Sequence, residues 1–266
     1  MLSNLHTHTT FCDGKDTPEE IILYAIDRGF SSIGFSGHGY TPFDLRYCMK
    51  DTDGYIKEIS ALVEKYRNKI QIYCGVEEDA FSAVQRDRFD YIIGSLHYGC
   101  VDGKYYPIDS SRDYFARCLE AYGNDAIALA KDYYANFTRY IAQRKPDIVG
   151  HFDLITKFDE TEAPLLQSNP EYIGLSEKYM EIASDCDVLF EVNTGAISRG
   201  YRSAPYPAEN LLHILRKKGG KVILSSDSHS AKTLDFYFDK ATEILKDIDF
   251  DGVYELCDGE FVKRHI

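Results

Sequence analysis

The sequence predicts an α/β fold in which parallel strands form a barrel and helices cover it from outside. Short apolar segments and amphipathic segments alternate about seven times along the 266 residues, a pattern typical of parallel strands connected by helices. Residue types that bind metals stand where most of these strands end. A barrel brings all its strand ends to one mouth, whereas an open sheet gathers its site at one switch point, so the pattern favours a barrel.

The expected elements have local signals at their ends. Thr17 is a typical N-cap, Pro18 suits a first helical turn, Glu20 completes a capping box with Thr17, and Gly29 ends this first helix. The expected strands cover residues 1–5, 32–36, 71–76, 91–96, 147–150, 188–192 and 222–226. The other expected helices cover residues 53–66, 111–144 with a break near Gly123, 170–184, 207–218 and 235–245. A polar loop around residues 102–104 and a short apolar stretch at 252–254 complete the chain.

Composition narrows the possible functions. With 44% hydrophobic residues the chain can bury a large core, and without a linker-like or repeated segment it is expected to form one domain over residues 1–266. Its formal net charge of −13 argues against a general affinity for nucleic acid or for anionic membranes. The sequence has no signal peptide, no apolar run of membrane-spanning length and no Cys-x-x-Cys pair among its seven cysteines, so we expect a cytoplasmic protein with reduced thiols. Oligomeric state has no signal in the sequence.

Two motifs near the ends of the chain place pairs of metal-type ligands at strand ends. His6 and His8 stand two residues apart after the first strand, so both imidazoles point to the same side. Asp227 and His229 have the same spacing after the strand that ends at Ser226. Because the carboxyl ends of barrel strands converge, we expect the two motifs to lie together in space.

Further candidate ligands follow the strands in between. Glu77 is the first polar side chain after an apolar run, and Glu78 points the opposite way and is expected to be a bystander. His213, in a helix, and His265, at the terminus, are expected to be structural or to face solvent. Cys12 is set aside, because all other candidates are nitrogen or oxygen donors. The nine candidate ligands are His6, His8, Asp13, His38, Glu77, His97, His151, Asp227 and His229.

Nine ligands are more than one metal ion needs. A catalytic zinc ion takes about three protein ligands and keeps one position open, so the set suggests three ions. A carboxylate such as Glu77 can bridge two of them, and two bridged ions activate water and clamp a phosphoryl group. Three divalent ions outweigh the three carboxylates, so the site stays positive within an acidic protein, as a phosphate ester requires. These ligand types accept Zn, Mn and Fe alike, so the metal is not specified.

The ordered motifs resemble those of the PHP (polymerase and histidinol phosphatase) family over nearly the whole chain. They are His6-Thr7-His8, Asp13, Gly37-His38-Gly39, Gly75-Val76-Glu77, Gly94-Ser95-Leu96-His97, Gly150-His151-Phe152-Asp153 and Ser226-Asp227-Ser228-His229. One departure is Ser228, where many members carry Ala, and we expect little effect from it. The resemblance implies a distorted (β/α)7 barrel, similar to a TIM barrel, with a three-metal cluster at the mouth where the strands end.

The resemblance also implies which ligands share an ion. The first ion would be held by His6, His8, Glu77 and Asp227, the second by Glu77, His97 and His151, and the third by Asp13, His38 and His229. Glu77, Asp227 and His229 are the residues expected to act in catalysis. In this scheme, Asp227 or a water molecule protonates the leaving alkoxide.

Within the family, segments 150–155 and 191–194 resemble the histidinol-phosphate phosphatases most. This implies hydrolysis of L-histidinol phosphate in histidine biosynthesis, with Arg199 gripping the phosphate through its planar fork and Lys157 as a second candidate. The candidates for binding the imidazole and ammonium groups are Tyr40, Phe43, Asp79 and Tyr98. The alternatives are a PHP phosphoesterase acting on phosphotyrosine or nucleotides, a metal-dependent exonuclease, which the acidic balance disfavours, and a non-catalytic metal-binding barrel.

Overall fold

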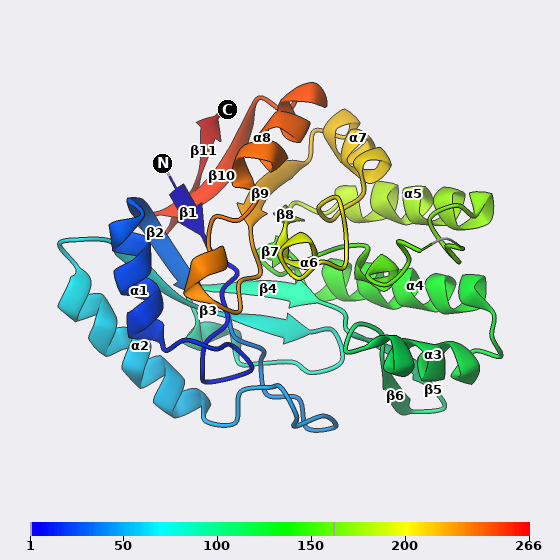
Figure 1. Cartoon of the computed structure of the whole chain (residues 1–266), viewed down its shortest axis with the longest axis horizontal. Helices are drawn as coiled ribbons and strands as arrows, with labels where there is room; N and C mark the ends of the chain where they lie inside the picture. The colour runs from blue at the N-terminus through cyan, green and yellow to red at the C-terminus, as the bar shows by residue number, and fades with distance from the viewer. Residues whose placement is uncertain (1, 162) are drawn as a thin grey trace.

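The computed structural model describes residues 2–161 and 163–266, and its centre is one curled sheet with helices around it (Figure 1). The strands follow the order β1-β2-β3-β4-β7-β8-β9-β10-β11, parallel from β1 to β10, with β11 antiparallel to β10. Met1, which the sequence places in the first strand, lies outside the described residues. The strands are β1 (Leu2–Asn4), β2 (Phe30–Phe35), β3 (Gln71–Asp79), β4 (Tyr91–Ser95), β7 (Ile148–Val149), β8 (Leu189–Asn193), β9 (Lys221–Ser225), β10 (Gly252–Cys257) and β11 (Glu260–His265).

The curled sheet closes where the chain leaves β1 and β9. Thr7, just past β1, forms a parallel bridge with Ser228, just past β9. The backbone N–H of His8 donates to the carbonyl oxygen of Ser228 (2.8 Å), and the N–H of Ser228 donates to the carbonyl oxygen of His6 (3.1 Å). Among the described residues, the seven parallel strands from β1 to β9 therefore surround one mouth. This confirms the predicted α/β barrel in its distorted (β/α)7 form.

Helices connect these strands and cover the outside of the sheet (Figure 1). The predicted capping box begins α1: Thr17 Oγ1 accepts from the N–H of Glu20 (3.3 Å), and the Glu20 carboxylate accepts from the N–H of Thr17 (2.8 Å). The predicted break near Gly123 is present, with positive φ angles at Gly123 and Asn124. None of the described helices has the length and apolar character of a membrane span. The helices are α1 (Pro18–Asp27), α2 (Thr52–Tyr66), α3 (Arg112–Ala121), α4 (Ala126–Arg144), α5 (Pro170–Ser184), α6 (Gly195–Ser198), α7 (Glu209–Lys217) and α8 (Phe238–Asp247).

Packed side chains fill the inside of the barrel below the mouth. The buried members of this cluster are Leu5, Tyr73, Tyr91, Ile93, Ile148, Leu189, Ile223 and Leu256. The ring of Tyr91 occupies the space left by Gly34 and Gly75, where a Cβ atom would collide with it, and its hydroxyl donates to the carbonyl oxygen of Leu5. This close-packed floor holds the strand ends above it in fixed positions.

Two segments differ from the sequence prediction. The expected polar loop at residues 102–104 contains the turn of a hairpin between β5 (Tyr98–Val101) and β6 (Lys104–Pro107). The expected apolar stretch at 252–254 is the start of a second hairpin, β10–β11, which turns at residues 258–259. Both turns are Asp-Gly pairs with positive φ at both residues, the typical signal of a two-residue hairpin. His265 therefore lies in a strand, and its side chain is exposed, as is that of His213.

Candidate active site

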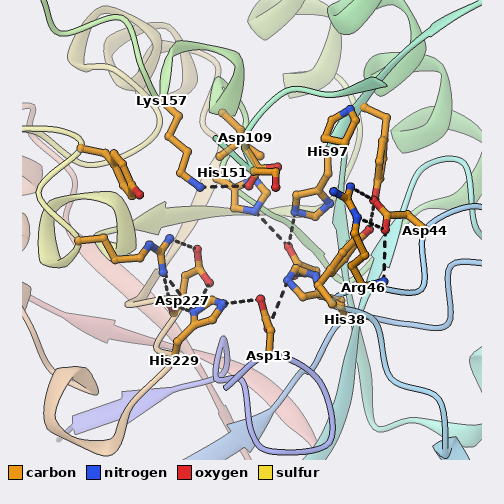
Figure 2. A pocket seen from close by; sticks show the side chains of 18 residues that line it. Asp13, His38, Asp44, Arg46, His97, Asp109, His151, Lys157, Asp227 and His229 are labelled. Atoms are coloured by element: carbon orange, nitrogen blue, oxygen red, sulfur yellow. Dashed lines mark hydrogen bonds and ion pairs between the residues drawn. The ribbon is translucent and has the colours of Figure 1, made fainter. Parts of the chain in front are cut away.

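The structure brings the nine candidate ligands together at the mouth of the barrel. Figure 2 shows the side chains of six of them pointing toward a common centre: Asp13, His38, His97, His151, Asp227 and His229. His6 and His8 follow β1, Glu77 lies on β3, and the others follow the ends of neighbouring strands. Seven of the nine are largely buried, whereas the side chains of Asp13 and His229 are 34% and 23% exposed. The convergence that the strand-end pattern predicts is therefore present in the fold.

Glu77 occupies the centre of this group, and its two carboxylate oxygens face different histidines. The contacts of Oε1 are His151 Nε2 at 3.0 Å and His97 Nε2 at 3.3 Å. The contacts of Oε2 are His38 Nδ1 at 2.8 Å, His6 Nε2 at 3.4 Å and His8 Nε2 at 3.6 Å. With only 1% of its surface exposed, Glu77 has the geometry of a carboxylate able to serve two ions at once.

The other two carboxylates flank Glu77. Asp227 Oδ1 lies 3.1 Å from His8 Nε2 and 3.7 Å from His6 Nε2. Asp13 contacts His229 Nε2 at 3.3 Å and His38 Nε2 at 3.8 Å. Within the described residues, three sets of side chains have ligand atoms within 4.8 Å of one another: His8-Asp13-His38-His229, His6-His8-Glu77 and His38-Glu77-His97. His151, which the family pattern groups with Glu77 and His97, is not in the third of these sets but touches Glu77.

Unpaired buried atoms show that these residues fit metal ions. The Nε2 atoms of His6 and His8 and the Oε2 atom of Glu77 are buried and, among the described residues, form no hydrogen bond of normal geometry. A buried polar atom without a partner costs about 1–3 kcal/mol, so native proteins pair nearly all of them. Imidazole nitrogens and a carboxylate oxygen that face one another across a few ångströms are a donor set for Zn²⁺ and similar divalent ions.

The electrostatics of the group favour positive charge between the carboxylates. Burial alone would raise the pKa of Glu77, but the imidazoles of His38 and His6 lower it well below its ordinary range. Burial works against a charged His6, but the carboxylates of Glu191 and Glu77 outweigh it and raise its pKa well above the usual value. Burial and the neighbouring His229 lower the pKa of His8 to about 3. Glu77 and the two flanking carboxylates are therefore ionised at neutral pH. Bound cations would supply the positive charge that balances these carboxylates.

Comparison with known proteins identifies the family. A model of the PHP domain matches residues 4–195, which is more than half of the chain. The chain belongs to the PHP domain family. A Schizosaccharomyces pombe protein assigned as a histidinol-phosphatase is 28% identical over 277 residues, covering 95% of this chain and 87% of its own length. The histidinol-phosphatase of Lactococcus lactis is 24% identical, covering 92% of this chain and 90% of its own length.

Two solved structures share the fold of this PHP protein. A Listeria monocytogenes protein assigned as a histidinol phosphatase superposes with a TM-score of 0.78 at 21% identity, over 90% of this chain and 99% of its own. The Lactococcus lactis histidinol phosphate phosphatase, solved in complex with Zn, L-histidinol and phosphate, superposes with a TM-score of 0.72 at 20% identity, over 98% of both chains. At these identities the two structures establish the PHP barrel fold.

Two further carboxylates support histidines of this PHP site from behind. Glu191, within β8, accepts a hydrogen bond from His6 Nδ1 at 2.5 Å. Asp79, at the end of β3, lies 3.2 Å from His97 Nδ1 and accepts from the backbone N–H groups of His97 and Phe81 (both 2.9 Å). Sequence reasoning missed the role of Glu191 and considered Asp79 for substrate binding. Asp79 is instead buried, and its oxygens are occupied behind His97.

A cleft of about 340 Å³ opens beside the candidate ligands. Both predicted substrate-binding cations line it. Arg199, at the end of α6, donates to Asp227 Oδ2 and to the Asp227 carbonyl oxygen (both 2.9 Å). Lys157 forms an ion pair with Asp109, with Nζ 3.2 Å from Oδ2, and Figure 2 shows this pair beside His151.

Besides Arg199 and Lys157, the cleft is lined by one more residue that was considered for substrate binding and by residues that were not expected there. Tyr98 lines the cleft, and its hydroxyl contacts Asp44 Oδ2 (3.1 Å) and the Tyr47 hydroxyl (2.6 Å). Of the other residues considered for substrate binding, Tyr40 and Phe43 do not line this cleft. Asp109 follows the β5–β6 hairpin, so its place in the cleft depended on a hairpin that the sequence analysis missed.

Proposed function

We propose that this PHP protein is a metal-dependent histidinol-phosphatase, which hydrolyses L-histidinol phosphate to L-histidinol and phosphate in histidine biosynthesis. The observation that carries the proposal is the placement of nine buried or half-buried metal-type ligands beside a cleft that the side chains of Arg199 and Lys157 line. The relatives named above support the substrate, since those named or assigned as histidinol-phosphatases align along most of this chain. The expected cytoplasmic location and the absence of nucleic-acid and membrane partners remain predictions.

The proposed cofactor is a set of three divalent metal ions, Zn, Mn or Fe. The proposed ligands are His6, His8, Glu77 and Asp227 for the first ion, Glu77, His97 and His151 for the second, and Asp13, His38 and His229 for the third. The division of Glu77 contacts between its two oxygens supports its bridging role. When bound, such ions provide Lewis acidity, which activates water and neutralises the charge that develops on a phosphoryl group.

Asp227 is the proposed proton carrier of the reaction. Burial alone would raise its pKa, but the guanidinium of Arg199 and the neighbouring imidazole of His6 lower it well below the ordinary range. Asp227 is therefore ionised before the reaction. We assign it the proton that water releases on attacking phosphorus, which it then returns to the leaving alkoxide. Arg199 keeps the carboxylate oriented through its two hydrogen bonds.

The cations and carboxylates of the cleft match a substrate that carries both signs of charge. Arg199 and Lys157 are the proposed contacts of the phosphate, because both line the cleft next to the ligand group. Asp109, now paired with Lys157, is the proposed contact of the substrate ammonium. Substrate binding would exchange one ion pair for two, with phosphate on Lys157 and ammonium on Asp109. A phosphate ester without an ammonium would leave Asp109 without this partner.

The test is a hydrolysis panel with added Mn²⁺ or Zn²⁺. The panel contains L-histidinol phosphate, a phosphotyrosine peptide, nucleoside monophosphates and single-stranded DNA. We expect kcat/KM for histidinol phosphate to exceed that for a simple aryl phosphate at least tenfold, since about 1.4 kcal/mol of discrimination is a factor of ten. Equal or faster hydrolysis of the phosphotyrosine peptide would overturn the substrate assignment. Cleavage of DNA in preference to the phosphomonoesters would indicate an exonuclease instead.

A further inference from the structure

Glu191 is a fully buried carboxylate that joins two parts of the ligand group without belonging to it. Its Oε1 atom accepts from His6 Nδ1 (2.5 Å) and from the hydroxyl of Ser225. Its Oε2 atom accepts from the backbone N–H of His151 (2.8 Å) and from Asn193 Nδ2 (2.8 Å). All four donors are thus directed at one carboxylate, and two of them belong to candidate ligands, His6 and His151, that contact different oxygens of Glu77.

The contact between Glu191 and His6 fixes which nitrogen of the imidazole can bind a metal. An ionised carboxylate accepts hydrogen bonds and cannot donate them, so the 2.5 Å contact requires the proton on Nδ1 of His6. In the neutral ring, which is the form that binds a metal, the lone pair is then on Nε2, the atom that faces Glu77. Metal-binding histidines commonly use this arrangement, in which a carboxylate behind the ring sets its tautomer and orientation.

The backbone of His6 is held independently of its ring. Its N–H donates to Asn4 Oδ1 (3.0 Å), and Asn4 Nδ2 donates to the hydroxyl of Ser226 (2.7 Å) and so ties β1 to the end of β9. Loss of Glu191 would therefore leave the position of the His6 backbone in place. It would remove the hydrogen bond that sets the tautomer and rotation of the His6 ring. It would also remove the hydrogen bond that holds the backbone N–H of His151.

We propose that Glu191 is a positioning residue that sets the affinity of the centre for the ions held by His6 and His151. The inference rests on the proposed metal centre, although it does not depend on the substrate. It distinguishes Glu191 from the residues that touch the ions, because Glu191 acts only through its hydrogen bonds. Comparable carboxylates behind metal-binding histidines change metal affinity by about 10- to 100-fold when they are mutated.

Glu78 provides a matched control. It is as deeply buried as Glu191 and also accepts four hydrogen bonds, from Arg144 Nε (2.7 Å) and Nη2 (2.8 Å), the Tyr140 hydroxyl (2.8 Å) and the N–H of Val84 (2.7 Å). It adjoins Glu77 in the chain, but none of these donors is a candidate ligand. Glu78→Gln therefore reproduces the loss of a buried, saturated carboxylate without touching a proposed ligand.

The experiment measures Zn²⁺ content at graded free Zn²⁺ set by a chelator, by elemental analysis, for the parent, Glu191→Gln and Glu78→Gln. For Glu191→Gln we expect the free Zn²⁺ at half-saturation to rise about 10- to 100-fold for part of the bound zinc, while the fraction assigned to Asp13, His38 and His229 titrates as in the parent. For Glu78→Gln we expect the same Zn²⁺ titration as for the parent. The melting temperature of this variant should be lower than that of the parent.

Three outcomes are decisive against the proposal. A Zn²⁺ titration of Glu191→Gln that matches the parent would overturn it. An equal loss of affinity for all bound Zn²⁺ in Glu191→Gln and Glu78→Gln would also overturn it, because that result would indicate general loosening of the fold. A parent that binds no more than one Zn²⁺ would overturn the metal centre itself, and this result is separate from the other two. Should Glu191→Gln not fold, Glu191→Asp replaces it, because the shorter carboxylate cannot reach both His6 and His151 and should show the same selective loss.

Discussion

Replacing Asp109 by Asn tests how the cleft selects its substrate. Asp109 pairs with Lys157 at 3.2 Å, and their side chains are only 23% and 11% exposed. Burial alone would raise the pKa of Asp109, but the charge of Lys157 lowers it, so the carboxylate is ionised at neutral pH. The Asn side chain keeps the shape and removes this charge. The variant therefore lacks the carboxylate proposed to bind the substrate ammonium.

The expected size of the effect can be worked out from the interaction that the substitution removes. A hydrogen bond to a charged group contributes about 1.5–3 kcal/mol, so kcat/KM for L-histidinol phosphate should fall roughly 10- to 150-fold. An alkyl phosphate with an uncharged alkyl group lacks the ammonium, and its phosphate gains from the freed Lys157 charge. Its kcat/KM should stay unchanged or rise.

The assay compares the two substrates on the parent, on Asp109→Asn and on Asp113→Asn. Asp113 lies exposed on α3 and does not line the cleft, so its variant controls for the change in net charge. The reasoning fails if Asp109→Asn slows both substrates equally. Such a result would mean that Asp109 acts through the position of Lys157 and not on the substrate.

Three further predictions concern the metals and the fold. Elemental analysis of the purified protein should find more than one divalent ion per chain, and a value at or below one after reconstitution would contradict the cluster. Glu77→Gln should abolish turnover and weaken two ions together, because both carboxylate oxygens face histidines; activity within tenfold of the parent would show that Glu77 does not bridge. Arg144→Met leaves the buried charge of Glu78 without its ion-pair partner and should cost about 3–5 kcal/mol in urea unfolding, whereas a loss below about 1 kcal/mol would refute this account.

Much of the fold and of the candidate site could be predicted because their signals are local. A capping box such as that of Thr17 and Glu20 lies within four residues, and a ligand such as Glu77 is marked by its place at the end of an apolar run. Parallel barrel strands then bring such residues together without any further information about pairing. The strand-end rule was therefore enough to find the nine candidate ligands.

The hairpins were missed for a different reason. The chain pattern in residues 98–107 is dominated by tyrosines and a polar turn, so it lacks the apolar runs that marked the barrel strands. The Asp102-Gly103 pair was a usable signal, since Asp-Gly favours a two-residue hairpin turn. With that hairpin in place, Asp109 would have been expected near the mouth, because the chain returns there after β6.

Glu191 shows what a sequence can reveal about a supporting residue and what it cannot. A charged residue inside the apolar run of β8 was itself a signal, because a buried carboxylate is tolerated only when it is paired. Its partner could not be read from the sequence, since His6 is 185 residues away and β1 is not a neighbour of β8 in the sheet. The contact exists because the sheet curls until β1 reaches β9. A ligand can be found from its own strand, but the residue that orients it is found only when the closure of the barrel is known.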